Sequence, residues 1–183
     1  GASYASGMSV AEMWVEIDKI TGEMLFTDKP PRADQPIRIK ADDNLPLDGR
    51  LSEPVSQPPP LHERFVQFLP TDRQPPPAGY RTTVQVVAQA DALVIGVRAY
   101  DPSPQDIRAP LTRRDQVKRD QDFIAVIVDA VGDRRAAQFV RVNAAGVIAD
   151  GMYIAAGDSE ECACDSDVDA AAARLTDGYS VEV

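Results

Sequence analysis

Five apolar runs between residues 79 and 150 constrain the fold more than any other feature of this sequence. The runs are rich in valine and isoleucine, most are separated by turn-sized gaps, and aspartate or asparagine flanks their ends. They cover residues 83–88, 92–100, 123–128, 136–142 and 147–149. This pattern predicts an all-β fold, an antiparallel β-sandwich with polar loops at the ends of its strands.

In residues 123–128 the odd- and even-numbered positions are both apolar, which predicts a central strand buried on both faces. Turn-like sequences at 131–133 and 143–146 should join the last three runs into an antiparallel meander. Ser and Thr at the starts of 103–106 and 112–115 predict short helical turns that interrupt the sheet.

Two proline-rich segments, residues 54–60 and 70–77, hold four prolines each. Proline lacks the backbone donor that a sheet needs, so we expect extended surface segments there. Residues 64–69 between them have the composition of a short edge strand.

Residues 1–44 are expected to form an N-terminal extension and linker before a sandwich over 45–183. Ser9 and Glu12 fit a capping box, and the apolar spacing that follows favours a helix over 10–21. Residues 14–17 also alternate, so the competing prediction is a hairpin that turns at 18–22. A short strand is expected at 37–40.

The composition excludes several classes of partner. A net charge of −10 over 183 residues argues against nucleic acid and anionic membranes, because both require a positive field. The sequence holds no apolar stretch near the ~20 residues that a transmembrane helix needs. The first residues lack the basic and apolar regions of a signal peptide, so the N-terminus does not indicate a compartment.

Cys162 and Cys164 are the only cysteines, and His62 is the only histidine. Neighbours this close rarely form an unstrained disulfide, and two thiolates make half of a zinc site. Inert thiols, a labile disulfide and a soft-metal site all remain open.

A series of short motifs resembles the family 9 carbohydrate-binding-module-like domains found at the N-terminus of large exported bacterial proteins. The resemblance covers about residues 45–183. It rests on the segments 47–54, 65–67, 82–84, 91–102, 114–115, 122–129, 139–143 and 178–183, together with Gly146 and Asp150. Two departures concern the ligand: Ser56 stands where the family's entry motif has tryptophan, and the single tryptophan, Trp14, lies outside the matched region.

The resemblance implies a jelly-roll-like sandwich that binds an oligo- or polysaccharide without catalysis and contains structural calcium. It also implies an exported, periplasmic or cell-surface location. The strand pattern at 179–183 continues to the last residue, so we expect the sandwich to be truncated there and to serve the remainder of a larger polypeptide.

Four aspartates next to predicted strand ends are the candidate calcium ligands, because Ca²⁺ takes six to eight oxygen ligands. They are Asp120, Asp122, Asp129 and Asp150. The alternative is that these carboxylates accept backbone N–H groups in turns and pair with nearby arginines. The acidic segment 158–169 starts like an EF-hand loop, but Ala170 and Thr176 occupy the places of its glycine and its bidentate glutamate, which favours a solvated loop.

A basic patch stands out in this acidic chain, and with tyrosines near strand ends it makes the candidate saccharide site. The patch consists of Arg108, Arg113, Arg114, Lys118 and Arg119. Guanidinium groups bind carboxylates in two-point contacts, so the patch suits an anionic saccharide. Without the tryptophan clamp of the family, the binding should be weak. The proposed ligand-binding residues are Tyr100, Tyr153, Arg113 and Arg114, with Tyr80 as a further ring; ordinary packing and a solvated basic face are the alternatives.

No catalytic residues are assigned. A Ser-His-Asp arrangement would depend on His62 alone, and no pair of acids stands out as a glycosidase pair. Three functions remain in competition: a non-catalytic carbohydrate-binding module, a structural or protein-interaction domain on the same fold without sugar binding, and a metal-dependent hydrolase.

Overall fold

The computed structural model describes residues 10–17, 24–27, 40–41, 46–51, 63–67, 74–118, 120–132, 135–157, 159–161 and 166–183. These residues form eleven strands and one short 3₁₀ helix. In chain order they are β1 Val10–Ile17, β2 Met24–Thr27, β3 Lys40–Ala41, β4 Arg81–Ala88, β5 Leu93–Tyr100, η1 Pro104–Asp106, β6 Phe123–Asp129, β7 Ala136–Asn143, β8 Ile148–Ile154, β9 Ser159–Glu161, β10 Ala171–Leu175 and β11 Gly178–Glu182.

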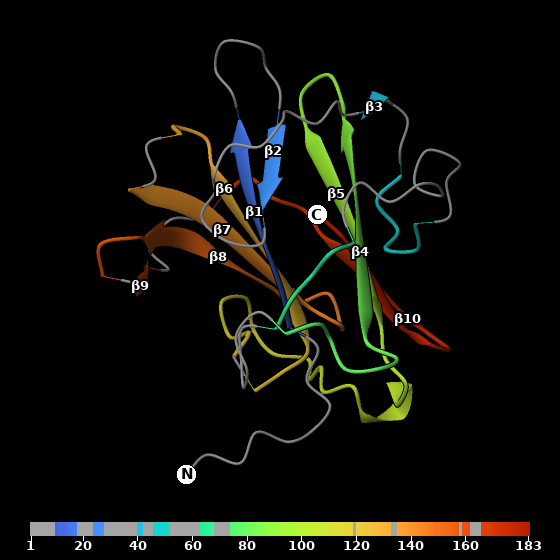
Figure 1. Cartoon of the computed structure of the whole chain (residues 1–183). Helices are drawn as coiled ribbons and strands as arrows, with labels where there is room; N and C mark the ends of the chain where they lie inside the picture. Colours follow the sequence, from blue (N-terminus) through green and yellow to red (C-terminus); the bar gives the residue numbers. More distant parts are fainter. Residues whose placement is uncertain are drawn as a thin grey trace.

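The strands form two sheets that pack face to face (Figure 1). Sheet A has the order β2-β1-β6-β7-β8-β9, and sheet B has the order β10-β11-β5-β4-β3. Neighbouring strands are antiparallel except for the pairs β1–β6 and β3–β4, which are parallel. The predicted β-sandwich is confirmed.

Alternate residues of both sheets fill the core between them, as a period of two requires. Sheet B contributes apolar side chains from β4, β5 and β11, and sheet A contributes them from β6 and β7. The buried members are Val84, Val86, Ile95, Val97, Ala99, Ile124, Val126, Val142, Tyr179 and Val181, with Ile107 from the loop after η1 and Ala144 from the turn after β7.

Strand β6 is the central strand that the sequence predicts. It pairs with β1 on one side and with β7 on the other, and Phe123 to Ile127 are all buried. Its second face is apolar too, because Ile127 packs with Phe139, which is 2% exposed, and Ala137. The meander β6-β7-β8 is confirmed.

The predicted N-terminal helix over 10–21 is wrong for residues 10–17, which form β1. This strand pairs antiparallel with β2, with Trp14 opposite Thr27, so the competing hairpin prediction is the correct one. It also pairs parallel with β6, from Val10 opposite Phe123 onward. The ladder with a distant strand outweighs the local capping signal, and strands from within 1–44 lie in both sheets.

Three smaller predictions have mixed outcomes. Helix η1 confirms the helical turn at 103–106, whereas Arg114 and Asp115 form a turn without a helix. Residues 63–67 form no strand; instead the Gln67 backbone N–H donates to the carbonyl of Gln74 at 2.8 Å. Lys40 lies in β3, and residues 37–39, 68 and 69 lie outside the described residues.

A strap, residues 46–51, lies over the outer face of sheet B. The backbone N–H groups of Asp48 and Gly49 donate to Oε2 of Glu182 at 2.9 and 2.6 Å, and the Ser180 hydroxyl donates to the Gly49 carbonyl at 2.5 Å. The side chain of Leu51 packs on Gly96, where a Cβ would meet it at 2.3 Å. The start of the segment that resembles the family's entry motif therefore covers a sheet face.

Several sequence predictions fall outside the described residues: those on His62, Ser56, Arg119 and both cysteines. The side chain of Trp14 is also outside the description. Among the described residues, no helix has the length and apolar character to cross a bilayer.

Candidate ligand-binding site

The four predicted calcium ligands do not come together. Asp122 directly precedes β6 and Asp129 ends it, so they lie about 23 Å apart at a strand rise of about 3.3 Å per residue. Asp150 lies two strands away, level with Val126. Since a calcium–oxygen bond is about 2.3–2.6 Å long, one ion cannot use both Asp122 and Asp129.

Three of these aspartates, Asp122, Asp129 and Asp150, accept backbone N–H groups, as the alternative interpretation has it. Asp129 Oδ1 accepts the backbone N–H groups of Val131 and Gly132, at 3.1 and 2.7 Å, in the turn after β6. Asp150 is buried between Arg114 Nη2 at 2.7 Å and the backbone N–H of Ser166 at 2.6 Å.

The part of the chain that the structure describes has no cluster of three metal-ligating side chains. One ion therefore cannot use all four aspartates, and a calcium site built from some of them stays a prediction.

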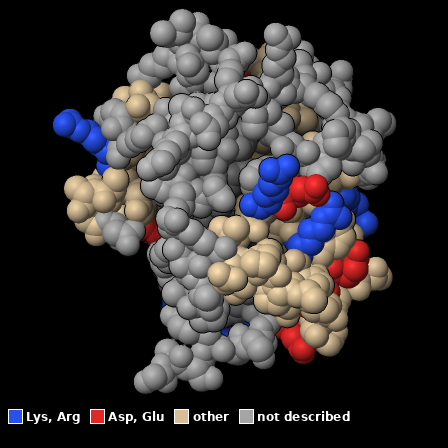
Figure 2. Space-filling view, viewed as in Figure 1, with Lys and Arg blue, Asp and Glu red and all other residues tan. Residues whose placement is uncertain are grey.

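The two candidate stacking rings lie on different sheets. Tyr100 ends β5 on the outer face of sheet B, where the guanidinium carbons of Arg98 and Arg81 lie 4.5 and 5.7 Å from its ring centre. Both arginines are paired with acids, Arg98 with Asp177 and Arg81 with Glu63. The described part of the face in Figure 2 likewise shows basic side chains next to acidic ones.

Tyr153 packs against the apolar cluster of Ile127, Ala137 and Phe139 on the outer face of sheet A. Because the outer faces of the two sheets point away from each other, Tyr100 and Tyr153 cannot hold one ligand. Both rings have contacts within the fold, and a role of either in ligand binding stays a prediction.

Tyr80 lies among acidic groups at the start of β4. Burial raises the pKa of its phenol, and the charges of Asp101, Asp122 and Asp106 raise it further, because each opposes a second negative charge. The Tyr80 hydroxyl therefore stays neutral at physiological pH and can donate a hydrogen bond.

Residues 108–118 and 120–122 belong to an Ω loop, a surface loop whose ends meet. The Asp122 backbone N–H donates to the Arg108 carbonyl at 2.8 Å, and the Arg108 N–H donates back to Asp122 Oδ2 at 2.7 Å. The carboxylate of Asp122 thus closes the base of this loop.

Asn143, at the end of β7, holds the Ω loop from inside. Its side chain is fully buried, and its Nδ2 donates to the Pro110 carbonyl and to Gln121 Oε1, both at 3.0 Å. Its Oδ1 accepts the N–H groups of Ala145 and Val147 in the turn to β8. One amide therefore joins the loop to the β7–β8 turn.

The middle of the Ω loop is attached to β8. The Asp115 N–H donates to the Ile148 carbonyl at 3.0 Å, and Arg114 reaches Asp150 as described above. Val117 is 4% exposed and packs with Phe123 and Ala149. These anchors fix the backbone of the loop on both sides of its basic residues.

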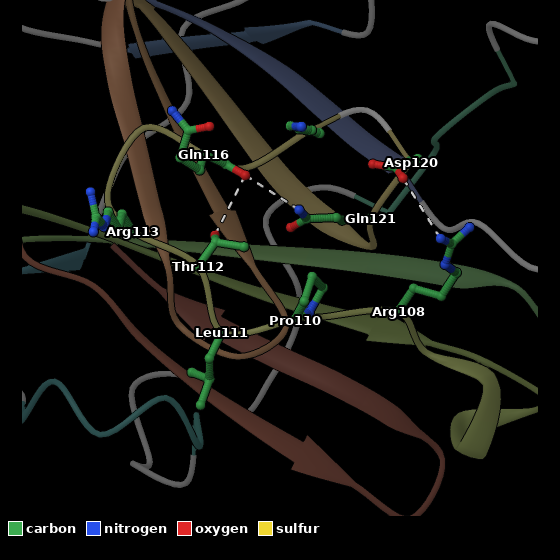
Figure 3. A pocket seen from close by; sticks show the side chains of 9 residues that line it. Arg108, Pro110, Leu111, Thr112, Arg113, Gln116, Asp120 and Gln121 are labelled. Atoms are coloured by element: carbon green, nitrogen blue, oxygen red, sulfur yellow. Dashed lines mark hydrogen bonds and ion pairs between the residues drawn. The ribbon is translucent and has the colours of Figure 1, made fainter.

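A surface cavity of about 540 Å³ lies on the Ω loop, and polar and basic side chains line it (Figure 3). Its lining consists of Arg108, Pro110, Leu111, Thr112, Arg113, Gln116, Lys118, Asp120 and Gln121. Thr112 Oγ1 and Gln121 Nε2 both donate to the Gln116 carbonyl, at 3.4 and 3.3 Å, and so shape the floor between the charged groups.

The cations of this cavity differ in whether an acidic side chain pairs with them. Arg108 lies 3.6 Å from Asp120, whereas Arg113 and Lys118 make no ion pair with any residue that the structure describes. Both are exposed, so they present positive charge in a protein whose net charge is −10. The cavity has the chemistry of a site for an anion.

Of the predicted ligand-binding residues, Arg113 lines this cavity, while Arg114 is turned to Asp150. The amides Gln116 and Gln121 and the apolar Leu111, which is 85% exposed, were missed. Their arrangement depends on Asn143 and Asp150, which are distant in sequence, and no local signal in the loop reveals it.

Comparison with known proteins adds no relative: no protein-family model, no curated protein and no solved structure matches this chain.

Proposed function

We propose that this domain is a non-catalytic carbohydrate-binding-type module of a larger exported protein, and that it holds an acidic saccharide in the Ω-loop cavity. One observation carries the proposal: two unpaired cations, Arg113 and Lys118, lie at a firmly anchored cavity in an acidic chain. The motif resemblance over 45–183 supplies the saccharide as the class of ligand.

The side chains of the lining can make the contacts that an acidic saccharide requires. Arginine binds a carboxylate through two parallel N–H···O contacts, and lysine adds a point charge. Thr112 and Gln116 offer hydroxyl and amide groups that can bond sugar hydroxyls, while Leu111 offers a surface for C–H groups. The described part of the lining holds no aromatic ring, so the binding should be weak, with a dissociation constant of about 1 mM.

Calorimetric titration with a uronic-acid oligosaccharide and with a neutral oligosaccharide of equal length tests this function. We expect heat of binding from the acidic oligosaccharide only, with an affinity that falls as salt rises, because exposed charges are screened over about 8–10 Å. If neither sugar binds at millimolar concentration, the structural or protein-interaction domain is the better description.

Substitution of the two unpaired cations tests whether the saccharide binds in the cavity. Arg113→Gln and Lys118→Gln should each weaken binding of the acidic oligosaccharide by about fivefold, the factor that corresponds to about 1 kcal/mol for an exposed ion pair. Arg64→Gln is the matched control, because Arg64 is exposed and lies outside the lining. Equal losses in all three variants would place the effect in net charge and contradict a site in the cavity.

A further inference from the structure

One cation of the cavity has a carboxylate of the protein next to it. Arg108 Nη2 lies 3.6 Å from Asp120 Oδ2, beyond hydrogen-bonding distance, and the two side chains are 56% and 64% exposed. An ion pair between two such exposed side chains contributes little to stability, so a better acceptor can replace Asp120 at little cost.

The backbones of both residues are held while their side chains remain in solvent. Both backbone groups of Arg108 are bonded to Asp122, and the N–H of Gln121, next to Asp120, donates to the Lys118 carbonyl at 3.2 Å. Asp120 is the one carboxylate among the described residues of the lining, and its charge opposes the entry of any anion. It occupies a place at Arg108 that an acid group of a ligand would take.

Arg113, one of the two unpaired cations of the loop, lies elsewhere in the cavity. Figure 3 shows Arg113 on one side, Arg108 with Asp120 on the opposite side, and Thr112 and Gln121 between them. A ligand with one acid group can reach one of these positions, whereas a chain with acid groups on separate units can reach both.

We infer that Asp120 is an internal competitor of the ligand and that the cavity selects saccharides with at least two acidic units. One acid group pairs with Arg113, and a second displaces Asp120 from Arg108. This inference rests on the proposed function, since it assigns the ligand of the same cavity.

Asp120→Asn tests the competition, because it removes the charge and keeps the shape of the side chain. We expect the variant to bind a linear uronic-acid trimer about two- to fivefold more tightly than the parent, as loss of an exposed ion pair implies. In an Arg108→Gln background the same substitution should have a smaller effect, because the contact it relieves is already absent.

Asp106→Asn is the matched control for net charge, since Asp106 is exposed in η1 and lies outside the cavity lining. A monomeric uronic acid, which should pair only near Arg113, is expected to bind the parent and Asp120→Asn equally.

The outcomes separate the inference from the proposed function. If the parent binds the trimer but Asp120→Asn binds it no better, or gains no more than Asp106→Asn, the inference is overturned and the function stands. If the monomer gains as much from Asp120→Asn as the trimer does, selection for two acidic units is overturned. If the parent binds no acidic saccharide, both are overturned.

Discussion

Replacing Asn143 with alanine is expected to lower the free energy of unfolding by about 3–5 kcal/mol. The fully buried amide makes four hydrogen bonds, two to the Ω loop and two within the β7–β8 turn. Each polar group left buried without a partner costs about 1–3 kcal/mol. Urea unfolding of the parent and the variant measures the difference, provided that both transitions keep the same slope.

A matched substitution on the same strand controls for the loss of β propensity. Gln138 is exposed on β7, so Gln138→Ala should change the free energy of unfolding by no more than about 0.5 kcal/mol. Asn143→Ala should also weaken saccharide binding, because the Ω loop loses its inner anchor. A loss of stability below about 1 kcal/mol would mean that water replaces the amide and that Asn143 does not hold the loop.

Replacing Glu182 with alanine is expected to cost about 2–4 kcal/mol and to detach the strap at 46–51. The carboxylate is fully buried and accepts the N–H groups of Asp48 and Gly49, which would lose their acceptor. Hydrogen bonds to a charged group contribute about 1.5–3 kcal/mol each. Hydrogen exchange should show faster exchange of these two amides than in the parent, and urea unfolding gives the change in stability.

Glu182→Gln distinguishes the loss of charge from the loss of the acceptor. Glutamine keeps one carbonyl oxygen of similar reach, so it should retain the strap and lose less stability than alanine does. Unchanged exchange at Asp48 and Gly49 in Glu182→Ala would show that Leu51, packed on Gly96, holds the strap by itself.

The sandwich was predictable because its signal is local and repeated. In residues 123–128 the odd- and even-numbered positions are both apolar. That pattern indicates a strand with both faces buried, without specifying which elements bury them. The start of the chain was not predictable in the same way. Ser9 and Glu12 satisfy a helix-capping rule within four residues, but the partner that makes 10–17 a strand is β6, which the capping pattern does not encode.

The candidate site was predictable only in its chemistry. Arg113 was identified from charge alone, since a cluster of arginines is conspicuous in an acidic chain. The metal prediction treated aspartates at strand ends as neighbours, although the predicted strand at 123–128 already separates Asp122 from Asp129. The order of strands in the sheet, which sets where Asp150 lies relative to both, is not encoded locally. Tyr100 and Tyr153 were both named as ligand-binding residues because they lie near strand ends, and the topology places them on opposite outer faces.

The parallel pairing of β1 with β6 has a consequence for synthesis on the ribosome. Val10 is opposite Phe123, so the two partners are 113 positions apart in the chain. At about 5–20 residues per second, β1 emerges roughly 6–23 s before its partner. Until then the hairpin of β1 and β2 can form only with one edge open, and unpaired edges invite contacts with other chains. Completion of sheet A is therefore expected to be a late, slow step, because it closes a very long loop.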